Sequence, residues 1–404
     1  MFLLWSRVVA SLSPPARIGP YEVLGKLGGG GMATVFLGRK VVGRGIGSVA
    51  ALKVMLADLA IDPHFVQMFD DEAKLLAVLN HPNLSKTLES GTGDHLGYIA
   101  MELLLGRTLA DTWEAAHTAE HPFPFALTAW ICAQVARGLH HAHDVKDETG
   151  APFHLIHRDV NPSNIFLTYD GSVKLFDFGL AKAQGRTSKT KTGIVKGKVP
   201  YLSPEQLSQL PLDRRSDVFS LGTTLWEMTT LTRLFKREND LDTILAIRNA
   251  IVPDPRSFVD DYPDALWDIV KRSLAADREE RHATAVQLAD ELDAFAASQG
   301  ARDSSSALVT LLQELFPGER ETQARWLEKT ASLPPTTNMT TMAPPAPLVP
   351  SAEIGSLQEM TDAVPLGGLS ETRELREMRE IRALRDIRGE PSIPLDLIRR
   401  KPQP

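Results

Sequence analysis

The sequence contains one cysteine, Cys132, among its 404 residues. An internal disulfide is therefore excluded, and we expect the protein in a reducing compartment such as the cytoplasm. The sequence also lacks any run of about 18 apolar residues, the length that a membrane-spanning helix requires. We therefore expect no transmembrane segment.

Positive charge is in deficit as well. The chain has 44 Lys and Arg against 51 Asp and Glu, which gives a formal net charge of −7. This balance argues against broad nucleic-acid binding, and we expect no nucleic-acid partner. With 43% hydrophobic and 24% charged residues the composition is that of a globular protein, and the length allows two or three domains.

The two ends of the chain differ in composition from its middle. Residues 1–16 open on an apolar stretch without a basic leader, so we expect a disordered extension. Residues 331–369 are rich in Pro, Thr and Ala, which bury too little apolar surface to offset chain entropy, and we expect a disordered tail over 331–404. Within it, residues 371–388 favour a charged helix, which is either a docking helix for a protein partner or part of a solvated tail.

Between the ends, the pattern changes from strands to helices. Residues 17–104 contain short β-type runs and one helix, over 65–79. Residues 105–297 are mostly helical, with a long helix over 127–144 whose histidines we expect to be core or surface residues rather than metal ligands. Residues 298–330 add a helical appendage, expected to pack on the helical part. The sequence thus predicts an α+β fold.

The segment 157–179 carries the most informative polar side chains. Asp159 and Asn164 lie five positions apart around Pro162, and Asp177 follows a short β-type run. One carboxylate in such a set can take the proton of an attacking hydroxyl, while an amide and a second carboxylate can hold Mg²⁺ against phosphates. His-Arg-Asp alone would be read as a turn with an incidental acid. Its pairing with Asp-Phe-Gly at this spacing favours a phosphoryl-transfer site.

These residues resemble the signature of protein kinases, and the preceding sequence agrees with that resemblance. Glycines at 28–31, followed by Ala33 where a third motif glycine would stand, separate two β-type runs; alone, they would indicate only a turn. Lys53 ends an apolar strand, where its ammonium group needs an anion. Glu72, on the helix over 65–79, is the favoured partner, and Asp70 and Asp71 are the alternatives. Over residues 20–297 the chain is similar to the bacterial, eukaryotic-like serine/threonine protein kinases.

The resemblance implies a bilobal kinase-like fold with ATP and Mg²⁺ in the cleft between a small β-rich lobe (17–104) and a larger helical lobe (105–297). It implies that Lys53, held by Glu72, contacts the phosphates, and that Asp159 orients and deprotonates the acceptor hydroxyl. Asn164 and Asp177 would bind the metal. The implied ATP-contacting positions are Leu27, Gly28, Gly29, Gly30, Gly31, Met32, Ala33, Val35, Ala51, Lys53, Met101, Glu102, Leu104, Asn164 and Asp177.

Outside the catalytic segments, the resemblance implies structural supports and a regulatory loop. Glu205 in Ser-Pro-Glu would pair with Arg281, and Asp217 would bind the backbone of the catalytic loop. The polar, basic stretch 180–199 would be the activation loop, with Thr190 and Thr192 as candidate phosphosites. A Thr/Lys-rich loop that is merely solvated is the alternative.

Two positions depart from the family pattern. Asn161 stands where serine/threonine kinases usually have a Lys, and Lys198 stands where they usually have a Thr. We hypothesise that Lys198 supplies the positive charge that Asn161 lacks, and we therefore include it among the candidate catalytic residues. In the alternative, Lys198 points to solvent and activity is low.

The function expected from this resemblance is transfer of the ATP γ-phosphoryl group to Ser/Thr hydroxyls of proteins, with autophosphorylation of the activation loop, in signal transduction. A pseudokinase that binds ATP and recruits partners through its tail is the alternative, supported by Asn161 and Lys198. Tyrosine specificity is disfavoured because the sequence after His-Arg-Asp lacks the tyrosine-kinase pattern. A small-molecule kinase is disfavoured by Ser-Pro-Glu and the activation loop.

Overall fold

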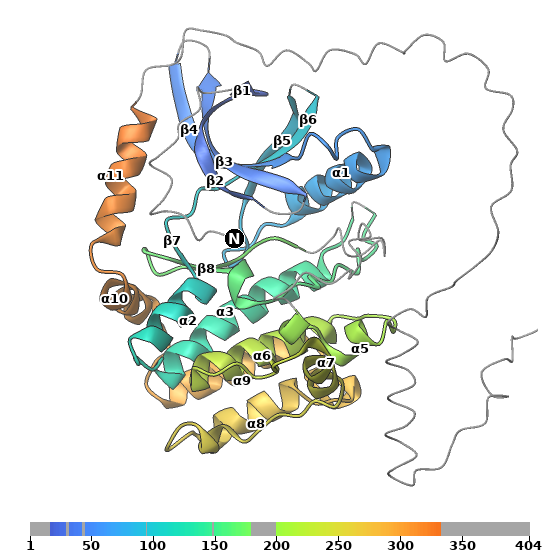
Figure 1. The fold of residues 1–404 in the computed structure, drawn as a ribbon, viewed down its shortest axis with the longest axis vertical. Coiled ribbons are helices and arrows are strands. Elements are labelled where there is room, and N and C mark those ends of the chain that lie inside the picture. Colours follow the sequence, from blue (N-terminus) through green and yellow to red (C-terminus); the bar gives the residue numbers. More distant parts are fainter. Residues whose placement is uncertain are drawn as a thin grey trace, which may run out of the picture. The chain divides into compact units, whose positions relative to one another are not determined.

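A computed structural model describes residues 17–29, 32–42, 45–93, 95–147, 149–178 and 199–332. Figure 1 shows a β-rich small lobe and a helical large lobe. Within the described part of the chain, no helix is long and apolar enough to cross a membrane.

The small lobe is built on a six-stranded antiparallel sheet with the order β1-β2-β3-β4-β6-β5. Its strands are β1 (Arg17–Ile18), β2 (Tyr21–Gly29), β3 (Ala33–Val42), β4 (Gly45–Met55), β5 (Thr87–Gly93) and β6 (Leu96–Met101). Side chains alternate between the faces of a strand, so β4 contributes to two apolar clusters. Ala50, Leu52 and Val54 pack in one cluster, and Ala51 packs in the other.

Helix α1 (Pro63–Val78) is the helix of the small lobe. Asp62 caps it by accepting a hydrogen bond from the backbone N–H of His64 at 2.9 Å, and Pro63 takes the first helical position, which requires no N–H donor. Its buried residues, Met68, Phe69, Glu72, Ala73 and Leu76, fall on one face. The carboxylate of Glu72 is thereby directed into the protein.

The large lobe starts with β7 (Gly106–Thr108), which forms a three-stranded sheet with β8 (Ile165–Thr168) and β9 (Val173–Leu175). Its helices are α2 (Leu109–Thr118), α3 (Phe125–Asp144), α5 (Pro204–Leu207), α6 (Arg215–Thr230), α7 (Asp240–Arg248), α8 (Asp264–Ser273) and α9 (Ala285–Ser298), with 3₁₀ turns η2 (Pro162–Asn164), η3 (Val199–Tyr201), η4 (Pro255–Ser257) and η5 (Arg278–Glu280). Helix α6 is buried nearly all round, as expected of a helix inside a large core.

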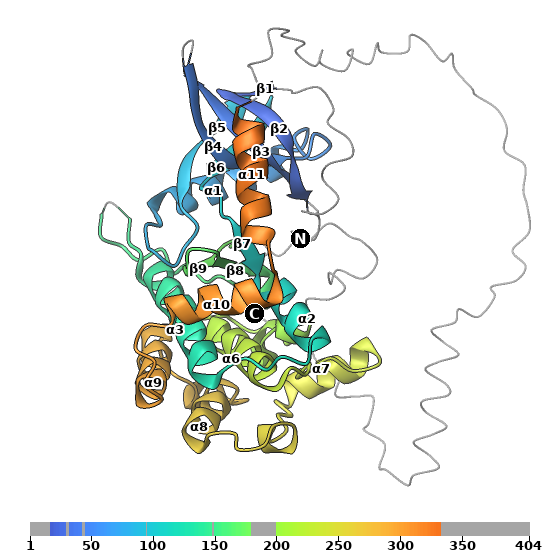
Figure 2. The same cartoon turned by 90° about the vertical axis from the view of Figure 1, so that its left-hand side faces the viewer.

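Two further helices follow, α10 (Ser305–Leu315) and α11 (Glu319–Ala331). Helix α10 lies beside α2 on the large lobe. Figures 1 and 2 show α11 continuing upward alongside the sheet of the small lobe. The expectation that the appendage packs on the larger lobe is therefore incomplete for α11, which contacts the large lobe through Glu319 and also reaches the small lobe. Trp326 and Leu327 are packed against an apolar cluster of the small lobe.

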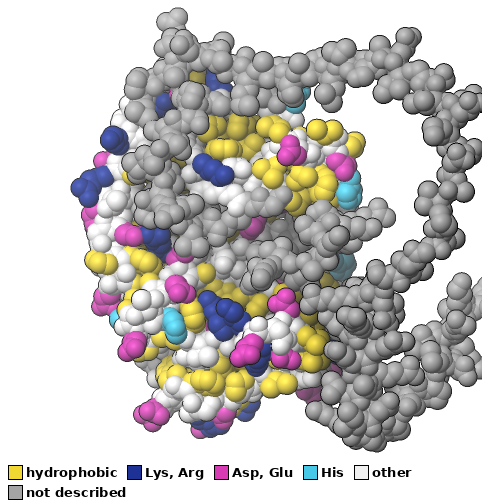
Figure 3. Space-filling model, in the orientation of Figure 1, with side chains coloured by type: hydrophobic (Ala, Val, Ile, Leu, Met, Phe, Trp, Pro, Cys, Tyr) yellow, Lys and Arg dark blue, Asp and Glu magenta, His cyan; other side chains and the backbone are white. Residues whose placement is uncertain are grey.

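The α+β, bilobal kinase-like fold expected from the sequence is the fold that the structure shows. The extension over 1–16 and the tail beyond residue 332, with its expected helix at 371–388, lie outside the described residues. On the face drawn in Figure 3, the described acidic and basic side chains are interspersed over both lobes.

Candidate active site

The centre of the site is an ion cluster that joins the two lobes. Lys53 on β4 places its Nζ 2.6 Å from Oε1 of Glu72 on α1 and 2.9 Å from Oδ1 of Asp177, which follows β9. The side chain of Lys53 is 15% exposed and that of Glu72 is 9% exposed. Because the pair is largely buried, salt weakens its attraction far less than that of a surface pair. Three residues distant in the sequence are thus joined by one ammonium group.

The electrostatics of this cluster favour a charged lysine. Burial disfavours the ammonium form, but the carboxylates of Asp177 and Glu72 outweigh that effect and raise the pKa of Lys53. Burial also raises the pKa of Glu72, against the opposing effect of Lys53. With one cation and two carboxylates, the fully ionised cluster keeps one negative charge.

Asp159 and Asn164 contact each other on one loop, residues 157–164, which we call the catalytic loop. Nδ2 of Asn164 donates to the carboxylate Oδ2 of Asp159 at 3.0 Å and to its backbone oxygen at 2.8 Å. Both residues are buried, with exposed fractions of 9% and 3%. Since the amide nitrogen is committed to Asp159, the atom that Asn164 offers to a cation is its carbonyl oxygen.

Asn161 has a structural role in the same loop. Its Nδ2 donates to the backbone oxygen of Asp159 at 2.8 Å, and its Oδ1 accepts from the N–H of Ser163 at 3.0 Å, which caps η2. The side chain is 2% exposed. Asn161 therefore closes the loop around Asp159. Sequence reasoning treated it only as a missing lysine, although Asn directly before Pro is a helix-start signal that could have revealed this role.

The loop backbone is held from below by α6. Asp217 accepts hydrogen bonds from the N–H groups of His157 and Arg158, both at 2.8 Å, and its Oδ2 lies 2.8 Å from Nε2 of His143. Arg158 has a φ of 64° and Asp177 a φ of 61°. Such left-handed conformations cost about 1–3 kcal/mol each in residues other than glycine. The contacts around Asp217 offset that cost at Arg158.

His157 links the catalytic loop to the segment that carries Asp177. Its Nδ1 accepts from the N–H of Asp159 at 3.3 Å, and its Nε2 lies 3.2 Å from the carbonyl oxygen of Phe176. Burial lowers the pKa of His157, so the neutral ring with a proton on Nε2 satisfies both contacts. Sequence reasoning assigned no role to this histidine.

Several of the expected ATP-contacting positions lie together. Leu27, Val35 and Ala51 belong to one apolar cluster, against which Met101 and Leu103 pack. The N–H of Glu102 donates to the carbonyl of Lys86 at 2.9 Å, so its carbonyl is the backbone group that it can present to a nucleotide. Strand pairing of Gly28 with Val35 and of Gly29 with Thr34 brings the start of the glycine loop over Val35.

Of the other expected residues, some lie within the described part of the chain and some lie outside it. Glu205 and Arg281 form the anticipated ion pair, with two contacts at 2.8 and 3.0 Å. Gln206 adds a contact that the sequence did not suggest, since its Nε2 donates to the carbonyl of Arg158 at 3.1 Å. Gly30, Gly31, Lys198, Thr190 and Thr192 lie outside the described residues.

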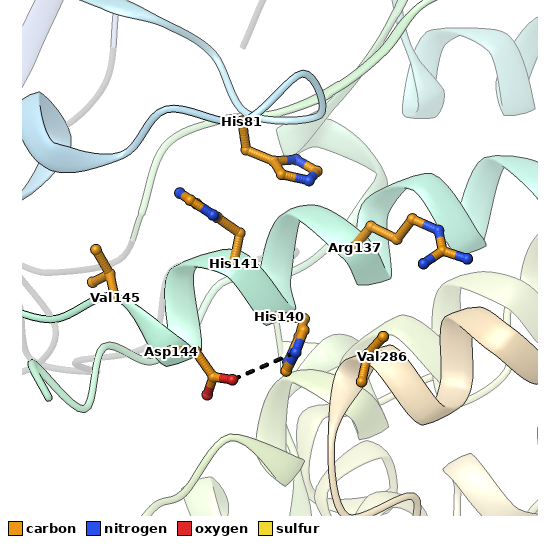
Figure 4. Close-up of a pocket in the computed structure, with 7 residues that line it drawn as sticks. All are labelled: His81, Arg137, His140, His141, Asp144, Val145 and Val286. Carbon is orange, nitrogen blue, oxygen red and sulfur yellow. Dashed lines mark ion pairs between the residues drawn. The ribbon is translucent and has the colours of Figure 1, made fainter.

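The histidines of α3 serve packing and ion pairing. His143 binds Asp217, and His140 lies 3.4 Å from Asp144. His141 stacks on His81 with ring centroids 5.2 Å apart. A cavity of about 370 Å³ is lined by residues of three elements: the segment after α1, helix α3 and the start of α9. Figure 4 shows its lining side chains, among them His81, His141 and Arg137. This cavity contains none of the cluster around Lys53.

The oxygen atoms of Asp177 and Asn164 fit a magnesium ion. Mg²⁺ prefers hard oxygen ligands, one or two of them from the protein and the others from water and phosphate. The Asp177 carboxylate, 26% exposed, and the Asn164 carbonyl come from neighbouring loops, since the N–H of Phe176 donates to the backbone oxygen of Asn164 at 3.1 Å. This donor set would suit a metal-bound triphosphate.

Comparison with known proteins agrees with this geometry. A sequence profile described as protein kinase domain matches residues 21–292. Tyrosine-protein kinase MasK of Myxococcus xanthus is 39% identical over 315 residues, which cover 78% of this chain and 49% of that protein. Serine/threonine-protein kinase PrkC of Bacillus subtilis is 33% identical over 282 residues, 70% of this chain and 41% of that protein. The chain thus matches about half or less of the length of these two relatives.

Solved structures give the same result. The crystal structure of the Mycobacterium tuberculosis PknI kinase domain matches with a TM-score of 0.53 and 26% identity, over 71% of this chain and all of that one. The profile match covers more than half of the present sequence. The chain belongs to the protein kinase domain family, in the bacterial branch related to the eukaryotic serine/threonine kinases.

Proposed function

We propose that the protein transfers the γ-phosphoryl group of ATP to Ser or Thr hydroxyls of protein substrates and to its own activation loop, as part of signal transduction. The observation that carries the proposal is the contact of Lys53 with both Glu72 and Asp177, beside the bonded pair Asp159 and Asn164. These contacts support the proposal, because phosphoryl transfer depends on charged groups held in fixed positions around the phosphates.

The chain's own residues divide the work. Lys53, kept charged by its two carboxylates, would neutralise the phosphates of the bound nucleotide. Asp159, fixed at its backbone oxygen by Asn161 and Asn164, would orient the acceptor hydroxyl and take its proton. Asp177 and Asn164 would hold Mg²⁺, which supplies charge neutralisation at the phosphates when bound. Phosphoryl transfer depends mainly on such positioning and charge.

The first test compares Asp159→Asn with the wild type for incorporation of labelled phosphate from Mg·ATP. We expect a loss on the order of 10²-fold or more, because the acceptor loses its base and its orientation. Asp58→Asn, the same change at an exposed position, should leave the rate unaltered. A wild-type protein that binds Mg·ATP without transferring phosphate would favour the pseudokinase alternative.

The class of acceptor has a second candidate. The relatives include PrkC, named a serine/threonine kinase, and MasK, named a tyrosine kinase and 39% identical to this chain. Transfer to tyrosine is therefore the competing assignment. Acid hydrolysis of the autophosphorylated protein followed by phosphoamino-acid analysis decides between them: phosphoserine and phosphothreonine support our proposal, and phosphotyrosine alone overturns it. Mapping of the modified residues tests Thr190 and Thr192, whose phosphates Arg158 would bind.

Lys198 is proposed to supply the charge that Asn161 does not. The buried Asn161 side chain is a neutral amide that is bonded to the loop backbone, so it supplies no positive charge to the phosphates. A unit charge about 4 Å from the phosphoryl oxygens is worth roughly 4 kcal/mol at an effective dielectric constant of 20. Lys198→Ala should therefore reduce kcat at least about tenfold, and Lys196→Ala, two positions earlier, should not. A kcat of Lys198→Ala within about twofold of wild type would remove Lys198 from the site.

A further inference from the structure

Helix α11 contacts both lobes and the segment between them. It has 13 residues, a length of about 20 Å. Figures 1 and 2 both show it rising from the end of α10 to the sheet of the small lobe. Contacts at its start, its middle and its end fall on three different parts of the fold.

The start of α11 is fixed to the large lobe. The carboxylate of Glu319 accepts a hydrogen bond from Nε of Arg107 on β7 at 2.7 Å, and a second contact from the same guanidinium. The hydroxyl of Tyr169, after β8, donates to the same carboxylate at 3.2 Å. The Arg107 guanidinium also lies 5.0 Å from the ring centroid of Phe316. These contacts anchor the helix on the β7–β8 sheet.

The middle of α11 binds the backbone where the interlobe segment enters the large lobe. Oε1 of Gln323 accepts from the N–H of Gly106 at 3.1 Å, and its Nε2 lies 3.4 Å from the carbonyl oxygen of Gly106 and from the hydroxyl of Tyr169. Gln323 is 3% exposed, so water cannot replace these partners without opening the contact.

Gly106 has little freedom to move elsewhere. Its φ is +156°, and a Cβ atom there would lie 2.0 Å from the carbonyl oxygen of Leu167. The residue is therefore restricted to glycine and pressed against β8 on one side. Gln323 holds its two backbone polar groups on the other side. The contacts with β8 and with Gln323 therefore fix the end of the interlobe segment 102–105, which contains the expected ATP-contacting residues Glu102 and Leu104.

The end of α11 is fixed to the small lobe. Trp326 and Leu327 pack against the cluster that contains Leu27, Val35 and Ala51, which are among the expected ATP-contacting positions. NH1 of Arg39 donates to the carbonyl of Ala331 at 2.8 Å, where a cation also meets the negative end of the helix dipole. Arg39 is 1% exposed and paired with Glu22, so this contact has a rigid base.

We propose that α11 is a positioning element for nucleotide binding, with Gln323 and Trp326 as positioning residues that set the interlobe segment and the small lobe without touching the nucleotide. The proposal rests on the proposed function and extends it. Because one helix is attached to both lobes, separating them requires breaking the contacts at one of its ends. The restraint therefore favours the spacing in which the expected ATP-contacting positions of the small lobe face the large lobe.

The test measures the dissociation constant of Mg·ADP, the KM for ATP and kcat for Gln323→Met in the full chain. Methionine keeps the length of the side chain and removes both polar partners of Gly106. We expect nucleotide affinity to fall roughly five- to tenfold, the size of one lost buried hydrogen-bonded group, with kcat at saturating ATP within about twofold of wild type. Glu328→Met, the same new side chain at an exposed position of α11, should change neither quantity.

A purely structural role gives a different result. It predicts a lower melting temperature for Gln323→Met with an unchanged Mg·ADP dissociation constant, and that outcome overturns the proposal. Should Gln323→Met not fold, Gln323→Glu retains the acceptor for Gly106 and loses the donor. An unchanged Mg·ADP affinity in that variant equally overturns the proposal, and weakened affinity supports it. Because Mg·ADP binding is measured without turnover, failure of phosphoryl transfer in the wild type would be seen separately.

Discussion

At the scale of single residues, the ion pair of Glu205 and Arg281 shows how burial and charge combine. The two residues are 5% and 2% exposed, and Ser216 donates a further hydrogen bond to Glu205 at 2.7 Å. Burial alone would raise the pKa of Glu205, but the contacts with Arg281 and Ser216 outweigh it and lower that pKa below its ordinary value of 4.5. The charged form of Glu205 therefore stabilises the fold.

The lowered pKa predicts how stability depends on pH. A carboxyl group with a depressed pKa in the folded state contributes stability above its unfolded pKa and loses it as pH falls toward its folded pKa. We expect Glu205→Gln to reduce the free energy of unfolding at pH 7 by about 3 kcal/mol, because a buried Arg281 loses its counter-charge. Urea denaturation at pH 7 and at several pH values below 4.5 should show that the difference in unfolding free energy between wild type and variant becomes smaller as the pH falls.

The control for this measurement is Glu280→Gln, which makes the same change at an exposed site. It should leave the unfolding free energy within about 0.5 kcal/mol at every pH. If the wild type and Glu205→Gln differ by the same amount at pH 7 and below pH 4.5, the pair is not stabilised by the charge on Glu205.

At the scale of elements, α6 supports the catalytic loop through one side chain. Asp217, 1% exposed, receives the N–H groups of His157 and Arg158 and a ring nitrogen of His143. These donors fix the backbone immediately before Asp159. The position of the proposed base therefore depends on a helix that has no part in the chemistry.

We predict that Asp217→Asn lowers kcat about tenfold or more and leaves nucleotide affinity within about threefold, since the loop moves and the contacts of the small lobe do not. Asparagine turns one acceptor oxygen into a donor facing other donors, which should also lower the unfolding free energy by about 1–3 kcal/mol. Steady-state kinetics and denaturation measure both effects. The exposed Asp268→Asn on α8 is the control, and an equal loss of kcat there would contradict this explanation.

Sequence reasoning predicted the elements better than their contacts. The catalytic loop and the strand before Asp177 carry their own motif, and Glu72 is favoured as the partner of Lys53 because its spacing to residues 80–84 is the one common in the family. The contact of Gln323 with Gly106 spans 217 positions, and neither residue belongs to a motif, so the local sequence gives no signal that predicts it. The role of Asn161 was missed because the residue was compared with a family pattern, while its hydrogen bonds are purely local.

At the scale of the whole molecule, the two lobes are joined by residues 102–105 and again through α11. The second connection depends on Trp326 and Leu327 against the small lobe and on Glu319 and Arg107 at the large one. Ligand binding stabilises a folded protein in proportion to the logarithm of its affinity. A weakened second connection should therefore be visible in the thermal response to nucleotide.

We predict that Mg·ADP raises the melting temperature of the wild type by more than that of Trp326→Ala at the same ligand concentration. Loss of the indole leaves the small lobe less firmly held, so part of the binding free energy is used to restore its position. Differential scanning calorimetry with and without Mg·ADP gives the comparison. Arg325→Ala, exposed and one residue away, should respond like the wild type. Equal shifts in all three proteins would show that the contact is irrelevant to the nucleotide.

The bond from Arg39 to the carbonyl of Ala331 has a consequence for everything downstream in the chain. It attaches the end of α11 to β3 of the small lobe, so the chain continues from that lobe into its remaining C-terminal residues. A partner protein that binds those residues would therefore exert force first on the sheet of the small lobe rather than on the helices of the large lobe.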